Sequence, residues 1–86
     1  MNIETNWMEN PKYKKRKPRL GDIIIDKHQK DEMTIINYFT DDGSIIMEFD
    51  SKKYNGTFSV PLDYFYEELG PYEDQAFEFK TKQDEK

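Results

Sequence analysis

The chain has 86 residues, no cysteine and a net charge of −5. A chain this short forms at most one small domain, and the lack of cysteine excludes disulfide scaffolds, thiolate catalysis and cysteine-ligated zinc. Charged residues make up 36% of the chain and hydrophobic residues 35%, so we expect part of it to lie outside the core. There is no apolar run of about 18 residues and no signal-peptide pattern, which predicts a cytoplasmic protein without membrane contact.

The charges are distributed unevenly along the chain. Residues 12–19 hold six cations and no acids, whereas residues 20–70 hold eleven acids and four lysines. We predict a flexible N-terminal segment over residues 1–19 that contains a basic arm, a small β-barrel over residues 20–72, and an acidic C-terminal tail over residues 73–86. Opposite charges attract, so the arm can lie back on its own acidic barrel.

The basic arm reads Pro11-Lys-Tyr-Lys-Lys-Arg-Lys-Pro-Arg19. Two prolines and dense like charge predict an extended or disordered segment. Such runs bind phosphate backbones, and Tyr13 can stack on a base, but a solubilising linker has the same composition. The candidate nucleic-acid contacts are Lys12, Lys14, Lys15, Arg16, Lys17 and Arg19.

The first predicted strand runs from Leu20 to Lys27. Its three consecutive isoleucines indicate that both of its faces are partly covered, as in a tightly curled small barrel. The polar residues 28–32 predict a loop, in which the only histidine, His28, is solvated.

Residues 33–50 predict a β-hairpin, because two segments rich in β-branched and aromatic residues flank Asp42-Gly43. A two-residue loop pairs Asp41 with Ser44. The residues that then share the inward face are Ile36, Tyr38, Ile45, Met47 and Phe49.

A three-residue hairpin loop is the alternative register. It pairs Ile35 with Phe49 and places Asn37 opposite Met47. We favour the two-residue loop, because the alternative puts an amide on the apolar face.

After a turn at Asn55-Gly56, residues 57–60 predict a strand with Phe58 buried. One 3₁₀ turn over residues 61–65 and a closing strand over residues 66–69 follow. Residues 76–80 alternate weakly and can form an additional edge strand.

The stretch from Asn55 to Phe65 resembles the end of SH3-like small barrels, in which a glycine turn, an aromatic strand, a proline and a tyrosine lead into the last strand. The matching positions are Gly56, Phe58, Pro61 and Tyr64, with Leu62 or Phe65 as the buried anchor. The order of Gly-Asp-Ile-Ile, Met-Thr-Ile and Glu-Phe-Asp is also similar to tiny bacterial and phage barrel proteins of unknown function. Over residues 20–70, the resemblance implies a mostly β, SH3-like five-stranded barrel with one 3₁₀ turn.

The sequence departs from SH3 domains at their peptide-binding groove. Those domains bind proline-rich peptides with a tyrosine-bearing first-loop motif and a tryptophan that opens the third strand. Residues 26–32 lack the first feature and Ser44-Ile45 lacks the second, so we expect no proline-rich recognition.

We expect a non-catalytic protein without a cofactor or bound metal. One histidine and no cysteine cannot build a cysteine–histidine dyad, and there is no phosphate-binding glycine loop or metal-binding motif. Adjacent acids are expected by chance in a chain with eighteen of them.

Two binding functions remain. The first is a protein-interaction module, in the manner of a phage or other mobile-element regulator or inhibitor, whose acidic, aromatic-rich barrel occupies a basic surface on a host protein. Trp7 either belongs to a frayed terminus, covers an open edge of the domain or anchors such a partner. The candidate contacts are Asp41, Asp42, Tyr64, Tyr66, Glu67, Glu68 and Trp7. The second is nucleic-acid binding by the basic arm and barrel aromatics, which the acidic barrel disfavours by repelling a polyanion.

Overall fold

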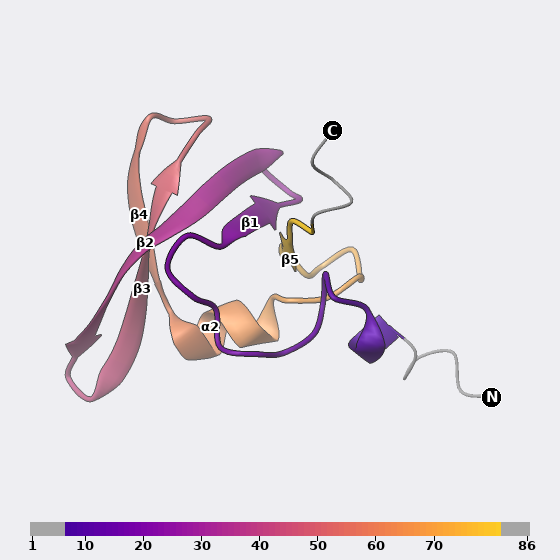
Figure 1. Cartoon of the computed structure of the whole chain (residues 1–86), viewed down its shortest axis with the longest axis horizontal. Coiled ribbons are helices and arrows are strands. Elements are labelled where there is room, and N and C mark those ends of the chain that lie inside the picture. The colour runs from indigo at the N-terminus through magenta and orange to yellow at the C-terminus, as the bar shows by residue number, and fades with distance from the viewer. Residues whose placement is uncertain (1–6, 82–86) are drawn as a thin grey trace.

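The structure is a computed structural model that describes residues 7–81. It contains a 3₁₀ helix η1 (Trp7–Glu9), a short α-helix α2 (Leu62–Glu67) and five strands. The strands are β1 (Ile23–Asp26), β2 (Asp31–Asp41), β3 (Ser44–Ser51), β4 (Gly56–Pro61) and β5 (Phe77–Phe79). They form one antiparallel sheet in the order β4-β3-β2-β1-β5 (Figure 1). The predicted mostly β fold is therefore confirmed.

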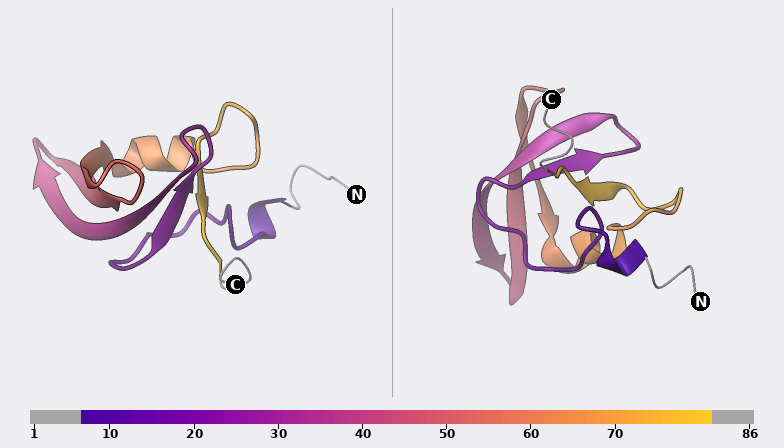
Figure 2. Two further views of the ribbon diagram at one scale, coloured as in Figure 1. Left: turned by 90° about the horizontal axis from the view of Figure 1, so that it is seen from above. Right: turned by 45° about the vertical axis from the view of Figure 1, so that its right-hand side comes forward.

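The sheet is curled, and α2 lies inside its concave side (Figure 2). Within residues 7–81, β4 and β5 are the two edge strands and do not pair with each other. The structure therefore shows an open curled sheet and not the closed barrel that the sequence suggested. No helix among these residues is long and apolar enough to cross a membrane.

The β2–β3 hairpin turns at Asp42 and Gly43, whose φ angles of 51° and 81° suit a tight two-residue loop. Asp41 pairs with Ser44, as predicted. An irregularity between Ile35 and Asn37 then shifts the register by one residue. Both candidate registers therefore occur in the same hairpin, one on each side of this bulge.

The bulge corrects the expected inward face of the hairpin. Ile35, not Ile36, pairs with Phe49 and is buried, while Ile36 is 44% exposed. Ile45, next to the hairpin tip, is also exposed. Met47 and Phe49 are fully buried, as expected.

The first strand begins at Ile23 and not at Leu20, because Gly21 adopts a φ of 93° that interrupts the extended chain. The central isoleucine of the three, Ile24, is buried and its neighbours are half-buried, which confirms that both faces are covered. The loop after this strand is shorter than expected, since β2 already begins at the buried Asp31.

The segment after β4 is helical. We expected a 3₁₀ turn over residues 61–65 and a strand over residues 66–69, but α2 occupies most of this stretch. The helix places Leu62 and Phe65 against the core, and Leu69, just after it, is buried and bridges to Phe77. The fifth strand is instead β5, within the region where we predicted an additional edge strand.

The core lies between the sheet and α2. Phe49 on β3 is fully buried, but Phe58 beside it on β4 is 45% exposed. Phe58 is therefore not the buried core residue that the alternation suggested, because an edge strand has a neighbour on one side only. The buried apolar residues are Ile24, Met33, Ile35, Met47, Phe49, Phe65, Leu69, Ala76, Phe77 and Phe79.

The basic arm is extended, as expected, but it is held against the domain. The amide of Phe79 in β5 donates to the carbonyl of Lys12 at 2.8 Å. Pro18 is fully buried, and the Tyr38 hydroxyl donates to its carbonyl. The arm therefore covers the outer edge of β5.

Candidate binding groove

A groove of about 590 Å³ opens between β4, α2 and β5. It lies at the open side of the curled sheet, because its lining includes both Phe58 and Val60 of β4 and Phe77 of β5. We call it the aromatic groove. Its lining residues are Asp26, Gln29, Asp31, Met33, Phe49, Tyr54, Phe58, Ser59, Val60, Tyr64 and Phe77.

The walls of the aromatic groove are exposed aromatic rings, and its floor belongs to the core. Tyr54, Phe58 and Tyr64 are 50%, 45% and 47% exposed. On one wall, the rings of Tyr54 and Phe58 meet edge-to-face with centroids 5.8 Å apart. On the other, Tyr64 meets the buried Phe77 edge-to-face at 6.3 Å. The groove is thus a place where core-like apolar surface reaches solvent, as in binding sites.

The only charged residues that line the aromatic groove are two acids, Asp26 and Asp31. One oxygen of Asp26 accepts from the amides of His28 and Gln29, both at 3.0 Å. Lys53 lies nearby over the ring of Tyr54, and its ammonium donates to the Gln29 carbonyl. Asp31 is buried, so the half-buried Asp26 is the acid of the lining that a cationic ligand can reach.

Asp31 holds the turn that carries Tyr54. Its two carboxylate oxygens accept from the Ser51 hydroxyl at 2.6 Å and from the Lys53 amide at 2.8 Å. The Ser51 hydroxyl oxygen in turn accepts from the Tyr54 amide at 3.1 Å. The Tyr54 hydroxyl donates to the Gln29 side chain at 2.7 Å. Tyr54 is thus fixed at the rim of the groove before any ligand arrives.

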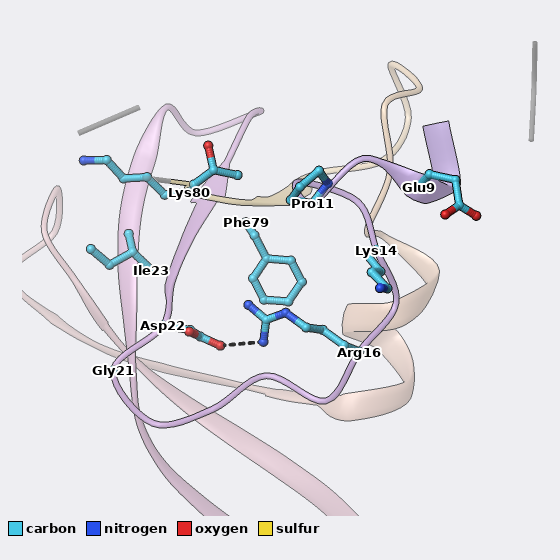
Figure 3. A pocket seen from close by; sticks show the side chains of 10 residues that line it. Glu9, Pro11, Lys14, Arg16, Gly21, Asp22, Ile23, Phe79 and Lys80 are labelled. Atoms are coloured by element: carbon cyan, nitrogen blue, oxygen red, sulfur yellow. Dashed lines mark hydrogen bonds and ion pairs between the residues drawn. The ribbon is translucent and has the colours of Figure 1, made fainter. Parts of the chain in front are cut away.

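A second hollow, of about 580 Å³, lies under the basic arm (Figure 3). We call it the arm pocket. Arg16 reaches from the arm into this pocket, with its guanidinium carbon 4.2 Å from the centre of the Phe79 ring. The same guanidinium pairs with Asp22 at 3.0 Å. The Arg16 guanidinium is therefore already engaged by an aromatic ring and a carboxylate.

Other cations of the arm are also engaged with the domain. The Lys15 ammonium donates to the Tyr66 carbonyl, and the Lys17 ammonium lies 5.5 Å above the Tyr38 ring. Burial raises the pKa of both Tyr38 and Tyr66, since the phenolate is disfavoured away from water. The candidate nucleic-acid contacts thus include cations that already contact the protein itself, namely Lys15, Arg16 and Lys17.

The candidate partner contacts are spread over the surface. Tyr64 lines the aromatic groove. Asp41 and Asp42 lie at the hairpin tip, and Tyr66, Glu67 and Glu68 lie on or just after α2, outside the lining of both hollows. Trp7 donates its indole N–H to the Tyr72 hydroxyl at 3.1 Å and meets the ring of Tyr13 edge-to-face.

Sequence reasoning missed most of the aromatic groove. Phe58 was assigned to the core, and Tyr54 and Phe77 were not assigned to a site. The signal that could have found them is the density of aromatic residues, since the chain has six tyrosines and six phenylalanines in 86 residues. A small core cannot bury all of these rings. Their meeting point depends on where the sheet stays open, which alternation alone does not reveal.

Comparison with known proteins finds no matching family model, no matching curated protein and no matching solved structure. The resemblance to SH3-like barrels therefore stays a prediction. Among residues 7–81, no group of three histidine or acidic side chains is placed to hold a metal ion.

Proposed function

We propose that this protein is a non-catalytic binding module that holds a cation-bearing segment of a partner protein in the aromatic groove. The observation that carries the proposal is the combination of half-exposed aromatic walls with a lining whose only charges are negative. Aromatic residues are enriched at the centres of protein interfaces, and a lysine or arginine gains from both an aromatic face and a nearby carboxylate.

Nucleic-acid binding by the basic arm has less support. Arg16 is paired with Asp22 and stacked on Phe79, so binding a phosphate through it would disrupt contacts within the domain. The chain also carries a net charge of −5. We expect no measurable duplex binding at about 150 mM salt, where the Debye length is about 8 Å. Submicromolar binding at that salt, lost when the arm cations become alanine, would replace the present proposal.

The groove can be tested with a displayed library of random peptides about ten residues long, since such segments span the groove when extended. We expect the protein to enrich peptides that combine apolar residues with lysine or arginine. Phe58→Ala and Tyr64→Ala should each weaken the selected peptides by about tenfold or more, as for truncated interface anchors. Phe39→Ala is the matched control, because Phe39 is an aromatic residue of similar exposure, 42%, outside the groove. No enrichment, or equal loss in the control, would contradict the proposal.

A further inference from the structure

The two edges of the sheet differ in how their backbone hydrogen bonds are used. At β5, the Phe77 amide donates to the Glu68 carbonyl at 2.8 Å, and the Phe77 carbonyl accepts from the Gly70 amide at 3.2 Å. The Phe79 amide donates to the Lys12 carbonyl at 2.8 Å. The outer side of β5 is therefore occupied by the chain itself.

The outer side of β4 has no such cover. In the part of the chain that the structure describes, residues 57–60 make no hydrogen bonds beyond their pairing with β3. Five of the six residues of β4 are exposed, and the strand Gly56-Thr-Phe-Ser-Val-Pro61 carries no charge. Proteins usually protect such edges with lysines, bulges or a covering segment. Here Pro61 protects only the end of the strand.

The uncovered edge borders the aromatic groove. Phe58 and Val60 pair with the buried Phe49 and Met47, so their side chains lie on the concave face and line the groove. Side chains alternate between the two faces of a strand. A strand added beside β4 would therefore place every second side chain next to Phe58 and over the groove.

We propose that β4 accepts an extended segment of the partner protein as an additional strand. Alternate apolar side chains of that segment would enter the aromatic groove, and a lysine or arginine would approach the half-buried Asp26. Main-chain hydrogen bonds supply affinity in this mode of recognition, and the pockets for alternate side chains supply specificity. The inference rests on the proposed function and adds to it the way in which the partner binds.

The charges around the groove favour a partner segment, and not a second copy of this chain, as the strand added beside β4. If two copies joined through β4, each would offer the other a neutral strand. The carboxylate of Asp26 would then gain no opposite charge from that strand. A basic, extended segment satisfies both the open backbone and the acidic lining.

Two lysine substitutions test the strand addition with the selected library peptides as probe. Thr57→Lys places a cation on β4, where Thr57 pairs with Asp50 of β3. A lysine on an edge strand opposes the addition of another strand, so we expect this substitution to weaken the selected peptides by about tenfold. Asn37→Lys is the matched control, because exposed Asn37 on the interior strand β2 pairs with another β3 acid, Glu48. It adds the same charge away from the edge and should leave affinity unchanged.

Amide hydrogen exchange on the unmodified protein gives a second measurement. Saturating peptide should slow exchange of outward-facing amides in residues 57–60 by about tenfold or more, and should leave the Phe79 amide unchanged. If Phe58→Ala weakens binding but the β4 amides stay unprotected, the groove is correct and the added strand is wrong. If Phe58→Ala has no effect, the proposed function itself fails. Protection of β4 that rises with protein concentration without peptide would assign the edge to a second copy and overturn the proposal.

Discussion

The two edge strands of this sheet differ in whether the chain covers their outer side. β5 has three residues, and both the basic arm and residues 68–70 form hydrogen bonds with its outer side. β4 has six residues and is paired on one side only. Phe79 of β5 is 2% exposed, whereas Phe58 of β4 is 45% exposed.

The chain uses its own polar and charged groups to cover β5 and not β4. The arm supplies Arg16 to cover Phe79 and the Lys12 carbonyl to satisfy the β5 backbone. No segment among residues 7–81 does the same for β4. Within residues 7–81, one edge of the sheet is therefore protected and the other is open, and the proposed strand addition rests on this difference.

The largest expected effect is on the free energy of unfolding, and it concerns two phenylalanines that pair directly between β3 and β4. Phe49→Ala should lower the free energy of unfolding by about 3–5 kcal/mol, because it leaves a cavity in the core. Phe58→Ala should lower it by only about 1 kcal/mol, because its ring is half-exposed at the edge. Urea denaturation measures both. Equal losses would mean that β4 is covered in solution and that the comparison of edges is wrong.

The sequence predicted the local structure of the hairpins well. Asp42-Gly43 and Asn55-Gly56 both mark turns, and Asp42 and Asn55 adopt the positive φ angles expected there. The bulge near Ile36 was not predictable, because either register buries a comparable set of apolar residues on the inward face. It depends on contacts of β2 with both of its neighbours, which a pairwise hairpin argument omits.

The two ends of the domain were also hard to predict, because tertiary contacts decide their structure. The spacing of Leu62, Phe65 and Leu69 suits either a 3₁₀ turn or an α-helix over so few residues. The position of the arm depends on contacts between residues far apart in sequence, such as Arg16 with Phe79, which are more than 60 residues apart. Charge asymmetry suggested attraction but could not identify Arg16 as the cation that stacks.

Removing the cover from β5 should make that edge behave like β4. Deleting residues 1–12 removes the carbonyl that accepts from the Phe79 amide. We expect hydrogen exchange at Phe79 to accelerate by about tenfold, which corresponds to about 1.4 kcal/mol. The Phe77 amide, which donates to Glu68, is the internal control. Unchanged protection at Phe79 would show that the arm does not define this edge.

A smaller effect is expected for the side chain that covers β5. Arg16→Ala removes the stacking on Phe79 and a partly exposed ion pair with Asp22, and should cost about 1 kcal/mol of stability. Arg19→Ala is the matched control, since the Arg19 side chain has no ion pair or ring contact within residues 7–81. Thermal denaturation should separate the two variants. Equal melting temperatures would indicate that the arm is held by its backbone alone.

An effect of similar size, and dependent on pH, is expected at the point where the arm meets the sheet. Burial raises the pKa of Tyr38 above its ordinary value of 10.0, and its hydroxyl donates to the Pro18 carbonyl. Its contribution to stability is therefore fully present below about pH 10 and is lost as the pH rises through the folded-state pKa. Tyr38→Phe should cost about 1 kcal/mol at neutral pH, the usual value of one hydrogen bond.

That difference between the parent protein and Tyr38→Phe should shrink above about pH 10, because the parent then loses the proton that makes the bond. Urea denaturation at neutral and alkaline pH measures it, with Tyr64→Phe as a control for a hydroxyl on the exposed groove wall. A constant difference across that range would mean that Tyr38 does not bind the arm through its proton. Attachment of the arm would then depend on the burial of Pro18 and the stacking of Arg16 on Phe79.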